Sequence, residues 1–189
     1  MAGSLVQVDT FTVSTAVSSI IIGGGTDSSS GIDFEINTDD VYMLAYSNVT
    51  TSTDGRNVAV RVTKTDGSGG GSADTTSNYD YAYKVLNAGA SFSGAGFENI
   101  SSWLYLFVDN VGTGTSETAN GIAYLYNFNA SEYSFVTVDM VEVNLTPHSR
   151  GNMGAGVHTV ASASDGLHFF DDAGGNIASG TFTLYGLKK

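Results

Sequence analysis

The sequence contains no cysteine, few basic residues and no long apolar run, and each of these shortages excludes a class of structure or partner. Without cysteine there can be neither a disulfide nor a thiolate metal site, so stability has to come from packing or from association of chains. Lysine and arginine number 7 against 19 acidic residues, which gives a formal net charge of -12. A nucleic-acid partner requires clustered cations, so we expect none. We also expect no membrane span and no signal peptide, because the N-terminus has no basic, apolar leader.

What the chain does contain is a series of short runs rich in Val, Ile, Thr, Tyr and Phe, separated by clusters of Gly, Asn, Asp and Ser. No segment keeps a helical period, so the pattern predicts strands throughout. A chain of 189 residues with a hydrophobic fraction of 41% can build one core. We therefore expect residues 1–189 to form a single all-β domain. The expected architecture is an antiparallel β-sandwich, jelly-roll-like, with about ten strands and Gly/Ser-rich loops.

Two segments give the clearest strands. Arg56 to Thr65 alternates valines with polar residues and lies between the turn signals Asp54-Gly55 and Asp66-Gly67, which favour hairpins. Val41 to Tyr46 is apolar on both faces, as expected of a buried central strand. A further short strand is predicted from Ile32 to Ile36.

Three other segments predict local irregularities. Asn120-Gly121 is a hairpin signal that precedes a strand. In the run from Tyr133 to Leu145, the valines and the methionine up to Met140 lie at even positions, whereas Val141 and Val143 lie at odd positions. This switch of face predicts a β-bulge or a new packing partner near Asp139. The stretch from Gly151 to Gly156 is rich enough in glycine to predict a loop.

No catalytic signature is present. The sequence has neither a nucleophile elbow nor a phosphate-binding loop. A glycosidase needs two carboxylates that converge across a cleft. Asp139 and Glu142 are close in the sequence, but their odd separation on a strand directs them to opposite faces. We therefore expect no enzyme activity, no catalytic residues and no cofactor.

Metal sites are not predicted either. His148, His158 and His168 occur at intervals of ten, which on strands defines no common site, so we interpret them as surface or packing residues. The pairs Asp39-Asp40 and Asp171-Asp172 could supply oxygen ligands to calcium. Neither pair belongs to a complete calcium-binding loop, and aspartates beside turns are usually solvated turn residues.

Aromatic residues at alternate positions supply candidate binding surfaces, because alternation places them on one face of a strand. Three interpretations are open, in this order: packing inside the sheets, a subunit interface, and stacking on sugar rings. The candidate residues for an interface or for glycan stacking are Tyr79, Tyr81, Tyr83, Trp103, Tyr105, Tyr124 and Tyr126.

The chain ends in a segment, Ile177 to Lys189, that reads as a strand. Phe182 and Leu184 lie on one face, and Tyr185 lies on the other with two threonines. A strand at the end of a chain needs neighbours along its length, so this segment is expected to close the sandwich.

The same ending, Ala178-Ser-Gly-Thr-Phe-Thr-Leu-Tyr-Gly-Leu-Lys188, resembles the closing strand of phage tail, fibre and decoration domains. The composition, cysteine-free and rich in Gly, Ser, Thr, Asn and Tyr, is similar to that of the same proteins. The chain thus resembles small β-sandwich virion structural proteins of short-tailed marine bacteriophages. The ending covers about a dozen residues, the composition covers the whole chain, and neither distinguishes capsid from tail.

The resemblance implies a protein that is made in the host cytoplasm and built into the virion in many copies, on its exterior surface or tail. Its partners would be other virion proteins and copies of itself, with a trimer as the first expectation for a closed homo-oligomer. The alternative function is a carbohydrate- or host-receptor-binding module on the particle surface, with host surface glycans as the partner. The resemblance assigns no individual residue a role.

Overall fold

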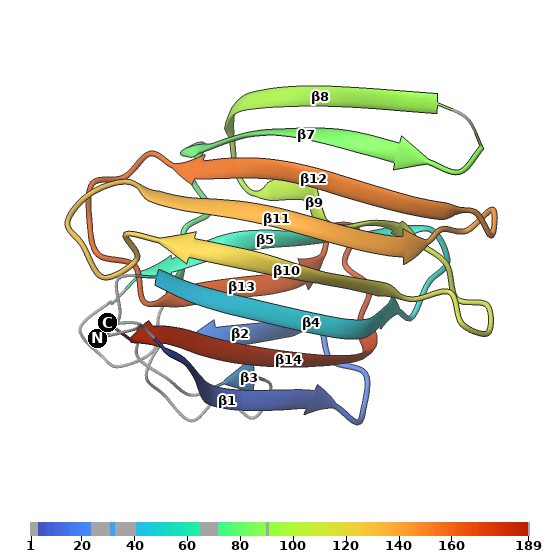
Figure 1. The fold of residues 1–189 in the computed structure, drawn as a ribbon, viewed down its shortest axis with the longest axis horizontal. Helices are drawn as coiled ribbons and strands as arrows, with labels where there is room; N and C mark the ends of the chain where they lie inside the picture. The colour runs from blue at the N-terminus through green and yellow to red at the C-terminus, as the bar shows by residue number, and fades with distance from the viewer. Residues whose placement is uncertain (1–3, 24–30, 33–40, 65–71, 90, 189) are drawn as a thin grey trace.

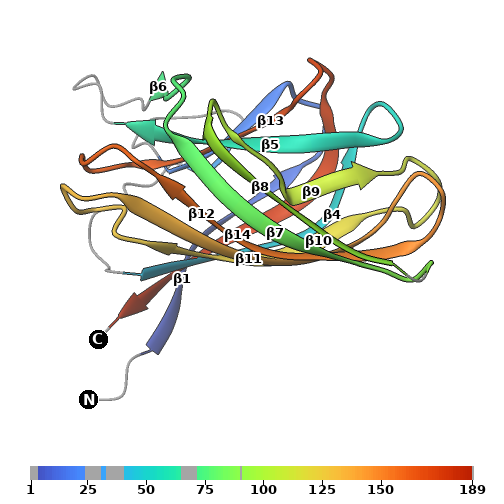
Figure 2. The same cartoon turned by 90° about the horizontal axis from the view of Figure 1, so that it is seen from above.

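The computed structural model describes residues 4–23, 31–32, 41–64, 72–89 and 91–188, which form two packed β-sheets without a helix. Figure 1 shows the larger sheet in front, and Figure 2 shows the two layers from above. The all-β sandwich predicted from the sequence is confirmed.

The eight-stranded sheet has the order β1-β14-β4-β10-β11-β12-β7-β8, and all its neighbours are antiparallel. Its strands are β1 (Ser4–Val13), β14 (Ile177–Lys188), β4 (Val41–Thr51), β10 (Ala119–Tyr126), β11 (Ser134–Val143), β12 (Ser149–His158), β7 (Tyr79–Asn87) and β8 (Ser91–Ile100). The second sheet has the order β3-β2-β13-β5-β6, and β9 also pairs with β5. Its strands are β3 (Gly31–Ile32), β2 (Ser19–Gly23), β13 (Gly166–Asp171), β5 (Arg56–Lys64), β6 (Ser72–Ala73) and β9 (Trp103–Val111).

The first half of the chain pairs with the second half in reverse order. Strand β1 pairs with β14, β2 with β13, β4 with β10, and β5 with β9. Such pairing is that of one long hairpin folded over on itself, with four of its strands in each sheet. Two hairpins are added to this plan: β7–β8 enters between β5 and β9, and β11–β12 enters between β10 and β13. Both extend the larger sheet beyond β10.

The core lies between the sheets and is rich in aromatic rings. Phe169 of β13 packs against Phe107 of β9 and Phe182 of β14, with both pairs of ring centroids 5.4 Å apart. Leu184 and Phe182 are buried, whereas Tyr185 is half-buried on the other face. The alternation predicted for the closing strand is therefore confirmed. The strand does not form an edge, because it lies between β1 and β4.

Strand β11 is regular, and the predicted bulge near Asp139 is wrong. Its residues pair one to one with β10 and β12, and buried and exposed side chains alternate without a break. The change in apolar parity arises because Val141 faces solvent while Glu142 is buried. A carboxyl group thus occupies a core position.

The predicted glycine loop at Gly151 to Gly156 is also wrong, since these residues lie in β12. A Cβ at Gly156 would lie 2.6 Å from Nε1 of Trp103, and one at Gly154 would lie 2.6 Å from Cδ1 of Leu106. The glycines therefore allow β9 of the second sheet to press closely against β12.

Gly156→Ala is expected to lower the free energy of unfolding by about 2 kcal/mol, because the methyl group cannot fit beside a buried indole. Gly151→Ala is the matched control in the same strand. Its Cβ would meet nothing closer than the Met140 carbonyl oxygen at 3.4 Å, so we expect a change of about 0.5 kcal/mol or less. Urea denaturation of both variants measures the difference, and equal losses would contradict the packing argument.

Other local predictions have mixed outcomes. Gly55 has a positive φ of 68°, as a turn at Asp54-Gly55 requires. Asn120-Gly121 forms no hairpin but lies within β10, where a Cβ at Gly121 would fall 2.3 Å from the Tyr46 hydroxyl oxygen. The segments Asp66-Gly67 and Asp39-Asp40, and most of Ile32–Ile36, lie outside the described residues. Strand β8 had no counterpart among the sequence-based predictions.

Candidate functional site

The outer face of the eight-stranded sheet, which points away from the core, carries a concentration of exposed apolar side chains. Register brings together residues from β10, β11, β12, β7 and β8. The exposed apolar residues on this face are Ile122, Tyr124, Phe135, Val141, Met153, Leu86 and Phe92. Each is at least 41% exposed, and Phe92 reaches 78%. Exposed apolar patches on protein surfaces often mark places where other molecules bind.

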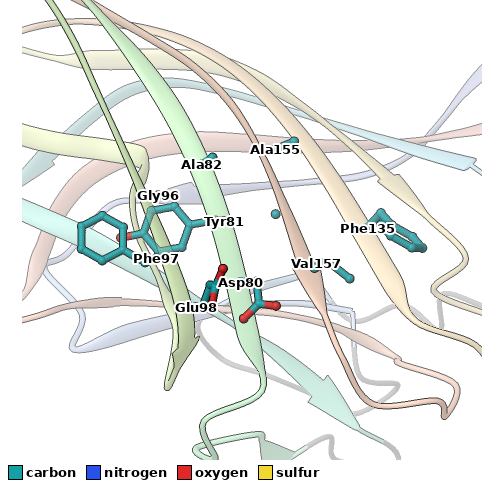
Figure 3. Close-up of a pocket in the computed structure, with 10 residues that line it drawn as sticks. Asp80, Tyr81, Ala82, Gly96, Phe97, Glu98, Phe135, Ala155 and Val157 are labelled. Carbon is teal, nitrogen blue, oxygen red and sulfur yellow. The ribbon is translucent and has the colours of Figure 1, made fainter.

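Small residues between the large ones hollow this face. Ala82 of β7 is opposite Ala155 of β12, and Gly96 of β8 is opposite Ala82. Beside them lies an open hollow of about 750 Å³, lined by Asp80, Tyr81, Ala82, Gly96, Phe97, Glu98, Phe135, Ala155, Gly156 and Val157 (Figure 3). In Figure 3, the carboxylates of Asp80 and Glu98 lie between the Tyr81–Phe97 ring pair and Phe135.

Three further hollows continue across the same face. One of about 570 Å³ lies beside Lys84, and two of about 420 and 460 Å³ lie beside Ile122. Met153 is placed by register between Asp139 and Lys84. The outer face is therefore broad, shallow and mainly apolar, with a few charged side chains set among the apolar ones.

Three of the aromatic candidates are core residues. Tyr79 and Trp103 are fully buried and Tyr81 is 5% exposed, so none can serve as a surface platform for a sugar or a subunit. The Tyr79 hydroxyl donates to the Asp74 carbonyl oxygen (2.8 Å) and accepts from the Val62 N–H (3.0 Å). For these three residues, packing inside the sheets is confirmed and the surface interpretations are wrong.

The other four candidates are more accessible. Tyr83 and Tyr105 are half-buried on the core side near the end of the sandwich, with ring centroids 6.1 Å apart. Tyr124 and Tyr126 lie on the outer face, where their rings stack with centroids 6.5 Å apart and Tyr124 is 42% exposed. The sequence could not distinguish the two stripes, because alternation fixes a common face but not which face is buried.

A polar cluster lies within the core, around the carboxyl groups of Asp109 and Glu142. The pairing of these two residues was not predicted from the sequence. The backbone N–H of Asp109 donates to Oε2 of Glu142 (3.0 Å). The Asp109 carboxylate accepts from Nδ2 of Asn152 (3.0 Å) and from Arg150, whose Nη2 lies 2.6 Å away. Asp109 and Glu142 are 3% and 2% exposed, so both are closed to solvent.

Burial dominates the electrostatics of this pair. The pKa of Glu142 is raised to about 8, chiefly by burial and also by the nearby Asp109 carboxylate, against the opposing effects of the Asp109 N–H and Arg150. Burial also raises the pKa of Asp109, which Asn152 and Arg150 partly offset. The expectation that Asp139 and Glu142 point to opposite faces is confirmed, since Asp139 is exposed. The sequence did contain a signal that Glu142 is buried, because it lies two residues from the apolar Met140 and such residues share one face of a strand.

Another polar cluster joins β5, β7 and β12 through Asp74. Its Oδ2 lies 2.8 Å from both Nζ of Lys64 and Nε2 of His158, and its Oδ1 accepts from the Thr76 hydroxyl and N–H. Burial opposes ionisation of Asp74, but these hydrogen bonds outweigh it and hold the pKa well below its usual range. Burial lowers the pKa of His158 despite its bond to Asp74. The group joins strands in the manner of a structural ion pair.

The remaining histidines and aspartates have separate surroundings. His148 is exposed, whereas the His168 ring stacks on Phe170 with centroids 5.3 Å apart. Asp171 accepts from the Ala173 N–H, as a turn aspartate does. Within the described part of the chain, no three His, Cys, Asp or Glu residues gather in a way that could hold a metal ion. No helix in that part is long and apolar enough to cross a membrane.

Comparison of the chain with models of known protein families and with curated proteins found no match. The function is therefore inferred from the chemistry and geometry of the chain itself.

Proposed function

We propose that this protein is a non-enzymatic structural component of a bacteriophage particle, which acts through protein–protein contacts in a multi-copy assembly. Its place would be the exterior surface or the tail, as a capsid decoration or a tail- or fibre-associated component. The observation that carries the proposal is the exposed apolar outer face on an otherwise strongly acidic sandwich. The phage-like ending of the chain supplies the biological setting.

The order of strand pairing supports a jelly-roll interpretation of the sandwich. Four strands in each sheet, paired first with last along the chain, are what a jelly roll requires. That architecture is frequent in viral capsid domains and in lectins. Both the structural function and its glycan-binding alternative are compatible with this architecture. The chemistry of the outer face is what favours one over the other.

The chemistry of the outer face favours protein partners. Its large side chains are aliphatic and aromatic and include Met153, and protein interfaces are enriched in aromatic residues and methionine. Five strands about 4.8 Å apart and about eight residues long, at about 3.3 Å per residue, span roughly 600 Å². A standard interface buries about 800 Å² on each partner. The face is therefore large enough to supply most of one stable contact.

A carbohydrate- or receptor-binding module is the second candidate, and the exposed Tyr124–Tyr126 stack favours it. Planar rings at the surface can stack on sugar faces. Binding on an array of host glycans that disappears in Tyr124→Ala, with folding intact, would support this function. Tyr81→Ala would be uninformative, because Tyr81 belongs to the core.

The structural proposal predicts that purified particles contain this chain in many copies, as measured by quantitative mass spectrometry. Val141→Lys is expected to reduce its incorporation at least tenfold, because it places a charge in the outer face at a side chain that is 51% exposed. Leu5→Lys is the matched control, at 47% exposure on β1 at the far edge of the same sheet. It should be incorporated normally if the contact is made over β10, β11, β12, β7 and β8. Absence from the particle, together with a strictly monomeric state in solution, would contradict the proposal.

A further inference from the structure

Strand β8 forms one edge of the eight-stranded sheet and is exposed over most of its length. It pairs only with β7 in the described part of the chain. Figure 1 shows it as the outermost strand at the top of the sheet. Phe92, the most exposed large apolar side chain among the described residues, lies on this strand opposite Leu86, which is itself 41% exposed. The strand thus presents unpaired backbone groups beside an uncovered apolar pair.

The edge lacks the features that normally prevent strands from pairing between molecules. From Ser91 to Phe97, β8 contains no lysine, proline or charged residue, and its register with β7 is unbroken. The opposite edge differs, because β1 carries a register shift between Gln7 and Asp9 and the charge of Asp9 itself. A bulge and a charge thus protect the β1 edge near its start, whereas the β8 edge is regular and neutral from Ser91 to Phe97, and its own register shift and Glu98 lie beyond that stretch.

We infer that β8 pairs antiparallel with β8 of a second copy of this chain, about a two-fold axis at Gly94. Two-fold symmetry makes a strand meet its own copy in the antiparallel direction, so the larger sheet would continue from one subunit into the next. The inference names a partner for the assembly proposed above and rests on that multi-copy assembly. It goes beyond it by specifying the strand, the symmetry and the register.

The register follows from the sequence of the edge. Gly94 is the midpoint of the regular stretch Ser91–Phe97, so centring the axis there pairs all seven residues. Phe92 then lies opposite Gly96 of the second copy on the same face, an arrangement in which an aromatic ring covers a strand glycine. Ser93 lies opposite Ala95 of the second copy on the other face. The sequence of the edge is thus complementary to itself.

Electrostatics favour this edge over other surfaces of the molecule. Two copies with a formal net charge of -12 each repel one another, so contact is easiest where negative charge is absent. The nearest acid on β8, Glu98, falls outside the paired stretch. In this register the two Glu98 residues would be about 26 Å apart, at ~3.3 Å per residue, which exceeds the Debye length of about 8 Å at physiological salt.

Analytical ultracentrifugation of the full chain tests the pairing, since a dimer has twice the monomer mass of 19.6 kDa. Phe92→Lys is expected to raise the dimer dissociation constant at least tenfold without loss of folding by circular dichroism, because the side chain contacts little within its own chain. Leu5→Lys on the β1 edge is the matched control and should leave the dimer intact. A monomer at all concentrations, a trimer, or a dimer unaffected by Phe92→Lys would overturn the inference.

The absence of cysteine allows a direct test of the register. Opposite residues of antiparallel strands have Cα atoms about 4.5–5.5 Å apart, within the range that a disulfide spans. Ser93→Cys mixed with Ala95→Cys should therefore form a cross-linked dimer on mild oxidation much faster than either variant alone. Equal rates for the mixture and for the single variants would reject an axis at Gly94.

The outcomes separate this inference from the proposed function. A wild-type protein that is monomeric in solution but present in purified particles would overturn the β8 pairing and leave the structural function intact. A β8-dependent dimer that never enters particles would do the reverse.

Discussion

A chain that ends at Ser179, and so lacks Gly180–Lys189, is expected to yield no soluble folded protein. The deletion removes most of β14, which lies between β1 and β4 rather than at an edge. In the described part of the sheet, β1 pairs with β14 alone, so the deletion would also detach β1 and expose the edge of β4. Truncated protein should appear in inclusion bodies, or in solution without a cooperative thermal transition.

The energetic loss is comparable to the stability of a whole domain. Phe182 and Leu184 are 1% and 0% exposed, and removal of such side chains costs about 3–5 and 2–5 kcal/mol. Phe182 also contacts Tyr46, with ring centroids 6.3 Å apart. Domains of this size are stable by about 5–15 kcal/mol, and the lost strand pairing adds to the deficit.

A shorter deletion, of Leu187–Lys189, is the control. Leu187 is 43% exposed, so its loss removes little core, and the paired stretch from Ile177 to Gly186 remains. This variant should fold with nearly unchanged thermal stability. If the longer deletion also folded and melted like the full chain, the segment Gly180–Lys189 would contribute nothing measurable to the stability of the protein.

Glu142→Gln is expected to stabilise the protein at pH 9 by up to about 5 kcal/mol and to have little effect below pH 4.5. The pKa of Glu142 is about 8 in the folded protein against 4.5 for an exposed glutamate. Between these values the folded state keeps a proton that the unfolded state has lost. Stability therefore falls as pH rises through this window, by about 1.4 kcal/mol per pH unit. Glutamine removes the penalty, and its amide oxygen can still accept from the Asp109 N–H.

Urea denaturation at several pH values from 4 to 9 measures this effect as a difference between variant and wild type, so that other titrating groups cancel. Glu132→Gln is the control, because it makes the same substitution at an exposed position. A Glu142→Gln profile parallel to that of the wild type would show that burial leaves the pKa of Glu142 where it is in the unfolded chain.

Strand periodicity predicted the all-β class and most of the strands, since polar and apolar residues alternate wherever one face is buried. It gave the faces of the closing strand correctly, with Phe182 and Leu184 inside. Strand periodicity failed where an ionisable residue occupies a core position. Glu142 in β11 made a regular strand look bulged, because the alternation rule assigns a carboxylate to solvent.

Glycine was misleading for a related reason. The sequence presents Gly154 and Gly156 as loop residues, and only the second sheet shows that Leu106 and Trp103 occupy the space of their missing side chains. Strand β8 escaped prediction because its Gly, Ser and Ala residues have weak strand preference and little burial to create a pattern. The outer face could not be predicted either, since it is assembled by register from strands far apart in the sequence.

The pairing of first strand with last also sets when the protein can fold. Thr10 and Thr183, whose hydroxyl oxygens lie 3.0 Å apart across β1 and β14, are separated by 173 residues of sequence. At a synthesis rate of about 5–20 residues per second, β1 leaves the ribosome roughly 10–35 s before its partner exists. During that interval the nascent chain carries unmatched strands, and closing such long loops makes folding slow. The sandwich should therefore be completed only once β14 has been made, and its yield in a cell should depend on chaperones that shield the early strands until β14 arrives.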